Sequence, residues 1–96
     1  MPQQESTIRI AEILRTIGHP LRVRMIEVLV EKKELTVKDL CQYLDTEQSL
    51  MSHHLNYMRI RGLLNSSRKG KNVFYSIRSQ SAMDLIRLLR ALEAQQ

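Results

Sequence analysis

The feature that most restricts the fold of this chain is a change in the spacing of its apolar residues at Gly62. Before Gly62, apolar residues recur every three or four positions, as they do along one side of an α-helix. Beyond it, Val73, Tyr75 and Ile77 alternate with their neighbours, as in a strand with one buried face. The sequence therefore predicts a helix that leads directly into β structure.

Helical spacing predicts four helices before this glycine, over residues 6–17, 20–30, 36–44 and 47–61. Pro20 suits the first turn of the second helix because its missing N–H would have no partner there. Thr36 and Asp39 have the spacing of a capping box at the start of the third helix. The Asp45-Thr46 turn is expected to supply capping oxygens for the fourth. The third and fourth helices with their tight turn form a helix-turn-helix pattern.

The rest of the chain predicts a β-hairpin and a last helix. Residues 63–67 and 72–77 flank a Gly-containing basic turn, as in a hairpin. Ser81 and Asp84 resemble a second capping box, and the helix beyond them has an apolar stripe of Ala82, Leu85, Ile86, Leu89 and Leu92. The predicted fold is mainly α with a small β-hairpin, a winged helix-turn-helix of four helices, two strands and a helix, with residues 1–96 as one domain.

Composition places this domain in a reducing compartment. A 43% apolar share with 4% aromatic residues is typical of a compact helical protein. The single cysteine, Cys41, excludes an internal disulfide. The first ten residues lack the pattern of a secretory signal, and no apolar run approaches the roughly 20 residues that span a bilayer. We therefore expect a cytoplasmic protein without a membrane partner.

The positive charge of the chain is confined to one third of its length. Residues 47–78 contain six basic residues and one acidic residue, a balance of +5, whereas the remaining residues hold nine of each. A localised basic surface is typical of proteins that bind polyanions, of which nucleic acid is the commonest soluble example. A solvated basic face without a partner is the alternative.

The helix over residues 47–61 is predicted to have one buried and one polar side. At about 100° per residue, Met51, Leu55 and Met58 share one side. The opposite side carries small polar groups that suit the major groove of DNA, where side chains reach base edges: Ser49, Ser52, His53 and Asn56, with Arg59 beside them. An ordinary solvent-exposed face is the alternative, although such faces usually contain acidic residues and this one has almost none.

The adjacent histidines of this helix point about 100° apart. Metal-binding pairs on a helix are spaced i, i+4, so His53 and His54 are not expected to share a metal ion. His54 lies toward the buried side, where a hydrogen-bonded packing role is predicted. No nucleophile motif or paired carboxylates indicate an enzyme.

The basic turn is predicted to support this helix on DNA. Arg68, Lys69 and Lys71 are expected at the hairpin tip, where they would bind phosphates or enter a minor groove. A solvated turn is the alternative.

Several motifs in order resemble the ArsR/SmtB family of bacterial winged-helix repressors. They are Q-S-L-M-S-H-H-L from Gln48, R-G-L-L from Arg61 and R-K-G-K-N-V-F-Y-S-I from Arg68, with H-P-L-R-V-R-M-I-E-V-L from His19 and E-L-T-V-K-D-L from Glu34 upstream. The resemblance implies a homodimer that binds a pseudo-palindromic operator and is released by an inducer. It also implies DNA contacts at Gln48, Ser49, Ser52 and His53.

The sequence departs from the metal-sensing members of that family. Thr36 and Lys38 stand where those members have Cys-x-Cys, and a lysine cannot replace a thiolate ligand. The last helix has no His or Cys and only Asp84 and Glu93 as carboxylates. No metal or other cofactor is therefore expected, and no pattern identifies the inducer. Cys41 is predicted to be a small buried apolar residue, with an intersubunit bridge or a modification as the alternatives.

Apolar stripes on both terminal helices exceed what one small core needs. Pairing these helices across a two-fold axis would bury the excess, through Ile10, Ile13, Leu14, Leu85, Leu89 and Leu92. Packing within the monomer is the alternative. Taken together, the sequence predicts a dimeric transcriptional regulator that represses by binding double-stranded DNA. A winged helix that serves as a protein–protein interaction module is the second hypothesis, and an enzyme is not expected.

Overall fold

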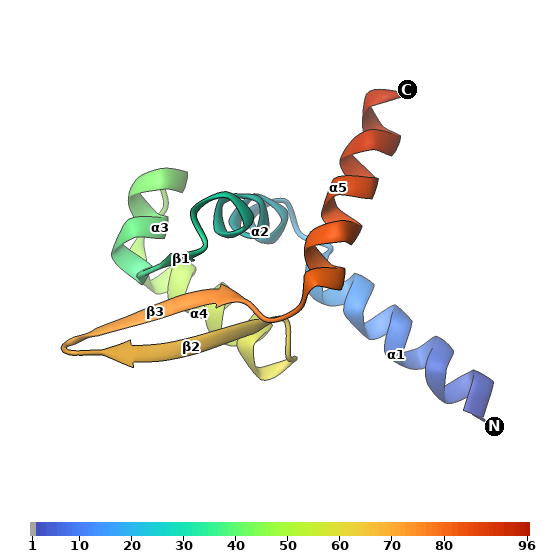
Figure 1. The fold of residues 1–96 in the computed structure, drawn as a ribbon, viewed down its shortest axis with the longest axis horizontal. Helices are drawn as coiled ribbons and strands as arrows, with labels where there is room; N and C mark the ends of the chain where they lie inside the picture. Colours follow the sequence, from blue (N-terminus) through green and yellow to red (C-terminus); the bar gives the residue numbers. More distant parts are fainter. Residues whose placement is uncertain (1) are drawn as a thin grey trace.

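The computed structural model describes residues 2–96 and shows five helices and a small three-stranded sheet. In Figure 1, α1 and α5 project from one end of the body and the β2–β3 hairpin projects from the other. The elements in chain order are α1 (Pro2–Ile17), α2 (Pro20–Lys32), β1 (Glu34–Leu35), α3 (Val37–Leu44), α4 (Gln48–Ile60), β2 (Leu64–Lys69), β3 (Asn72–Ile77) and α5 (Gln80–Ala94). This is the predicted winged helix-turn-helix with one additional strand.

The sheet is antiparallel with the strand order β1-β3-β2. The hairpin pairs Leu64 with Ile77 and Lys69 with Asn72, so only Gly70 and Lys71 form its loop. Gly70 has φ +64°, and a glycine with positive φ at the first central position is typical of a type II′ hairpin turn. Arg68 and Lys69, predicted in the turn, therefore lie at the end of β2.

Strand β1 was not predicted; it lies between the second and third predicted helices. The strand has two residues, Glu34 and Leu35, which pair with Ser76 and Tyr75 of β3. A two-residue strand has no periodicity to detect. It forms because β3 has a second edge whose N–H and C=O groups need partners.

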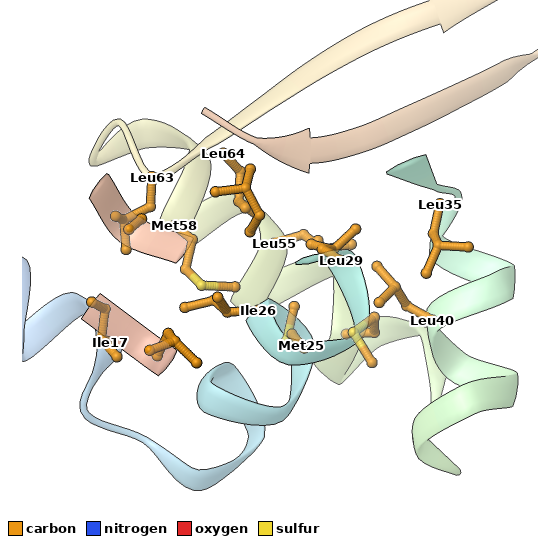
Figure 2. Close-up of a cluster of buried hydrophobic side chains, with 14 of the residues drawn as sticks. Ile17, Met25, Ile26, Leu29, Leu35, Leu40, Leu55, Met58, Leu63 and Leu64 are labelled. Atoms are coloured by element: carbon orange, nitrogen blue, oxygen red, sulfur yellow. The ribbon is translucent and has the colours of Figure 1, made fainter. Parts of the chain in front are cut away.

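The core lies where α2, α3 and α4 meet the base of the hairpin (Figure 2). All four of these elements contribute side chains to the core. Those with at most 2% of their surface exposed are Met25, Ile26, Leu29, Leu40, Met51, Leu55, Met58 and Leu64. Burial of these apolar groups is the main term that stabilises the fold.

Two helix starts agree with the sequence analysis. Pro20 occupies the first turn of α2, where His19 is the N-cap residue and its Nδ1 accepts the Leu21 N–H at 3.0 Å. At α3, the Thr36 hydroxyl accepts the Asp39 N–H and the Asp39 carboxylate accepts the Thr36 N–H, both at 3.1 Å. The predicted capping box is confirmed.

Two other predicted caps are wrong. Asp45 and Thr46 do not cap α4, because the N-cap residue is Glu47, which makes no side-chain capping bond. The Thr46 hydroxyl instead donates to the Leu44 carbonyl. Helix α5 begins at Gln80, and its cap is Ser79, whose hydroxyl oxygen accepts the Ala82 N–H at 3.2 Å. Ser81, the predicted cap, lies inside the first turn of the helix instead.

Helix α5 is fixed to α2 by a forked ion pair. Arg90 donates from Nε and Nη2 to the two carboxylate oxygens of Glu27, at 2.6 and 2.7 Å. The hydrogen bond from Arg90 lowers the pKa of Glu27.

Within residues 2–96, no helix is long and apolar enough to cross a membrane.

The capping box predicts a measurable contribution to stability. Thr36→Ala should lower the free energy of unfolding by about 1 kcal/mol, because the Asp39 N–H loses its acceptor. Urea unfolding followed by circular dichroism would measure the change.

Thr46→Ala is the matched control, since its hydroxyl only donates to a nearby carbonyl. An equal loss of stability in the two variants would contradict the capping role of Thr36.

Candidate nucleic-acid interface

Helix α4 has the two-sided character that its sequence predicts. Met51, Leu55 and Met58 are each 0% exposed, so one side of the helix is anchored in the core. The polar residues opposite them are exposed, except Ser52, which is half-buried: Ser49, Ser52, His53, Asn56 and Arg59. Gln48, also predicted to contact DNA, is exposed at the first position of the helix, three residues before Met51. The predicted exposure of this stripe is confirmed, and its contact with DNA stays a prediction.

Hydrogen bonds within the stripe orient its longer side chains. Arg59 Nη2 donates to Asn56 Oδ1 at 2.7 Å. This bond occupies the amide oxygen of Asn56 and leaves its NH₂ group, with the other N–H groups of Arg59, directed to solvent as donors. Guanine presents two acceptors in the major groove and adenine one. The Asn56–Arg59 pair is therefore suited to purine edges.

One residue of this surface was not predicted. Ile60 is 64% exposed and follows Asn56 by four positions, so it lies on the same side of α4. The helical wheel contained this information, but only polar residues were considered as contacts. An exposed isoleucine beside polar groups can contact the methyl group of thymine, as other apolar side chains do.

The cationic hairpin tip differs from its prediction in one respect. Arg68, Lys69 and Lys71 are all exposed, but Lys69 Nζ lies 2.5 Å from Glu34 Oε1 of β1 and 5.4 Å from the centre of the Phe74 ring. Within residues 2–96, Arg68 and Lys71 take part in no ion pair. They are therefore the freer cations of the tip, whereas Lys69 must leave Glu34 to reach a phosphate.

The two histidines of α4 separate as predicted. His53 is exposed, whereas His54 is 4% exposed and its Nδ1 lies 3.2 Å from Arg22 Nη1. Burial lowers the pKa of His54, and the nearby charges of His19, Arg22 and His53 lower it further. A neutral His54 can accept a hydrogen bond from Arg22 through Nδ1, so the predicted role of a hydrogen-bonded packing residue is confirmed.

The described residues offer no cluster with metal-site chemistry. In the part of the chain from Pro2 to Gln96, no three His, Cys, Asp or Glu side chains come together in a way that could hold a metal ion. Cys41 is half-buried against the core, less enclosed than the sequence predicted. The exposed chemistry of the domain is therefore the polar stripe of α4 and the cations of the hairpin tip.

The chain is similar to known bacterial transcriptional regulators. A family model described as "Bacterial regulatory protein, arsR family" matches residues 19–66. The chain is 35% identical over 83 residues to the transcriptional repressor PagR of Bacillus anthracis, covering 86% of this chain and 83% of PagR. It is 28% identical over 92 residues to the transcriptional activator HlyU of Vibrio cholerae, covering 96% and 84%.

The fold agrees with these relatives as well. The crystal structure of PagR aligns with a TM-score of 0.82, covering 90% of this chain and 98% of that chain at 35% identity. A structure of NolR from Sinorhizobium fredii aligns with a TM-score of 0.85 at 27% identity, covering 95% and 90%.

The Lys69–Glu34 pair predicts a gain of DNA affinity on its removal. Glu34→Gln should strengthen binding to duplex DNA of random sequence, because Lys69 is released and one negative charge near the tip is lost. Adding one phosphate contact should steepen the slope of log affinity against log salt by about one unit. Titrations between 50 and 200 mM salt would measure it.

Glu31→Gln is the matched control, because it removes the same charge from an exposed residue that pairs only with Lys32. If both variants gained affinity with the same slope, the release of Lys69 would not be the cause.

Proposed function

This chain belongs to the ArsR family of bacterial regulatory proteins, and we propose that it is a cytoplasmic repressor that binds a pseudo-palindromic operator as a homodimer. The family match and the relatives make it a transcriptional regulator with a DNA-binding fold, and not an enzyme. The observation that carries the proposal is the polar stripe of α4, exposed opposite three fully buried apolar residues.

Helix α4 reads the operator. A recognition helix enters the major groove with its first turns against base edges. Ser49, Ser52, His53 and Asn56 supply hydrogen-bonding groups there, and Arg59 is held by Asn56. The core residues Met51, Leu55 and Met58 fix the helix, so that these groups keep one orientation.

The hairpin tip adds affinity for DNA but little specificity for its base sequence. Arg68 and Lys71 contact phosphates or a minor groove beside α4, and Lys69 joins them when it leaves Glu34. Phosphate contacts set register and orientation on the duplex, whereas base contacts set specificity.

Dimerisation is supported by the apolar surface of α1 and α5. Among residues 3–96, seven of the ten exposed large apolar side chains lie on these helices: Ile8, Ile10, Ile13, Leu14, Leu88, Leu89 and Leu92. Leu85 is half-buried and lines a groove of about 410 Å³ between the two helices, together with Ile10, Ile13 and Leu14. Contiguous apolar surface of this kind marks an interaction site.

The arrangement of the helices suits a two-fold partner. The Glu27–Arg90 pair holds α5 against α2, so the stripe of Leu88, Leu89 and Leu92 stays exposed in one chain. A second copy would cover it and place two α4 helices one DNA turn, about 34–36 Å, apart.

Selection of genomic DNA bound by the protein tests operator binding. Recovered fragments should share a pseudo-palindromic site, and affinity for it should fall steeply between 50 and 200 mM salt as counterions are released. No retention on duplex DNA at low salt would refute the proposal and favour a protein–protein interaction module.

Base and phosphate contacts should respond differently to mutation. His53→Ala should reduce discrimination between operator and random DNA by about 1–3 kcal/mol if a base contact is lost. Lys71→Ala should weaken both sequences alike and flatten the salt slope by about one unit. Competition binding against random DNA at several salt concentrations separates the two. If His53→Ala behaved like Lys71→Ala, His53 would be a phosphate contact.

The dimer interface is testable with neighbouring residues of one helix. Leu92→Glu should raise the dimer dissociation constant at least about a hundredfold, because two leucines each lose about 1.5–3 kcal/mol of burial. Sedimentation equilibrium would measure it.

Ala91→Glu introduces the same charge about 100° around α5, at a position that is also exposed. It should leave the dimer intact. The proposed interface would be contradicted if both variants dissociated to the same extent. It would also be contradicted if the wild type were monomeric at high concentration.

A further inference from the structure

The Arg22 side chain connects three helices at the point where α1 ends. Its Nε donates to the Thr16 carbonyl at 2.7 Å, and its Nη2 lies 3.4 Å from the Arg15 carbonyl. Carbonyls in the last turn of a helix have no partner within that helix. Arg22 of α2 therefore supplies hydrogen-bond donors to the carbonyl groups at the C-terminal end of α1.

The same guanidinium reaches α4. Arg22 Nη1 lies 3.2 Å from His54 Nδ1, and Arg22 Cζ lies 4.4 Å from the centre of the Tyr57 ring. Arg61 also lies over the Tyr57 ring, at 3.5 Å. One buried side of α4 is thus joined to the end of α1 through a single side chain.

We propose that Arg22 and His54 form a latch that holds the recognition helix α4 in a fixed position relative to α1, and that protonation of His54 opens the latch and weakens operator binding. The inference rests on the proposed function, because α1 is taken to form part of the dimer interface and α4 to read the operator.

Protonation of His54 at Nδ1 would break its contact with Arg22. Neutral His54 accepts from Arg22 through Nδ1, but after a proton from solvent binds Nδ1, both partners are donors and both are cations. His54 is faced by Arg22 of α2, by the N-cap residue His19 of that helix, whose ring centre lies 4.6 Å away, and by His53 of α4, whose ring centre lies 5.6 Å away. On α1, the carboxylate of Glu12 is paired with Arg15.

The surroundings of His54 therefore oppose its protonation until the pH is acidic. Its pKa is lowered by burial and by the neighbouring cations, so the folded protein keeps His54 neutral near pH 7. The unfolded chain has the ordinary value of 6.5 and takes up the proton first as the pH falls. Stability is thus full above pH 6.5 and declines below it until the folded protein also binds the proton.

The latch matters for DNA because the duplex fixes the separation of the two half-sites. In the proposed dimer, α1 belongs to the interface and α4 to the groove, so the position of α4 relative to α1 sets the distance between the two recognition helices. Two recognition helices must lie about one DNA turn apart to bind together. Loosening α4 relative to α1 should lower affinity without altering any DNA-contacting residue.

The test measures affinity for the selected operator duplex from pH 7.5 to 5.0 at constant ionic strength. Wild type should lose affinity once the pH falls far enough below 6.5 for His54 of the folded protein to bind a proton. The loss should be at most about tenfold per pH unit for each proton, or about a hundredfold for the two His54 side chains of a dimer. His54→Asn keeps an acceptor near the position of Nδ1 and cannot be protonated, so it should lose much less. Equal acid losses in His54→Asn and wild type would overturn the proposal.

Two neighbouring histidines provide matched controls. His19→Asn retains an N-cap acceptor and removes an imidazole, and it should keep the acid loss of wild type. His53→Gln should bind more weakly at every pH and also keep that loss. If either variant abolished the acid loss, the proton would belong to that histidine and not to His54.

Arg22→Lys tests the positioning role. A lysine keeps the charge but cannot bind two carbonyls and a histidine at once, so it should lower affinity at pH 7.5 and remove most of the acid loss. It should also reduce the preference for the operator over a version with one extra base pair between half-sites. An unchanged spacing preference would contradict the positioning role.

A measurement without DNA separates this inference from the proposed function. In the NMR spectrum of the wild-type protein, the Arg22 Nε–H signal should shift or broaden with the same midpoint as the His54 ring. An Arg22 signal that is unaffected by the titration of His54 overturns the latch. If no duplex is bound at any pH, operator binding is refuted, and this titration alone decides whether the latch exists.

Discussion

The anchoring of one side of α4 in the core is the constraint on which the rest of this structure depends. Met51, Leu55 and Met58 are fully buried among residues of α2, α3 and β2. Their burial stabilises the fold and, in the same step, directs the polar residues of α4 outward. A helix that was apolar on all sides would add to the core but leave nothing to contact a partner. The burial of these three residues therefore supports both the fold and the recognition proposed for α4.

The hydrophobic effect also accounts for the terminal helices. Of the apolar residues of α1 from Ile8 onward, Ile17 is buried in the core, whereas Ile10, Ile13 and Leu14 remain exposed. In α5, Ala82 and Ile86 are buried and the leucines further along are not. The core of a 96-residue chain is filled by the three central helices and the hairpin. The surplus apolar surface is what supports the proposed dimer.

Polar contacts then join these two functional regions. Arg22 binds the end of α1 and the buried side of α4, and Arg90 fixes α5 to α2. At the hairpin, Lys69 is paired with Glu34, which lowers the number of free cations at the tip. Three of these contacts join residues far apart in the sequence: Arg22 with His54, Arg90 with Glu27, and Lys69 with Glu34. Each affects the geometry of a surface proposed to bind a partner.

The sequence by itself determined the helices, the hairpin and the exposed side of α4, because helical and strand periods are local properties that a single core enforces. It also predicted the Thr36 capping box and the burial of His54. Only the tertiary structure decided the caps of α4 and α5, the strand β1, the partner of Lys69 and the contacts of Arg22. The contacts of Arg22 with His54 and of Lys69 with Glu34 join groups 32 and 35 residues apart, about which sequence spacing carries no information. The caps are local, but the residue that begins each helix depends on where the preceding turn or strand ends in the folded chain.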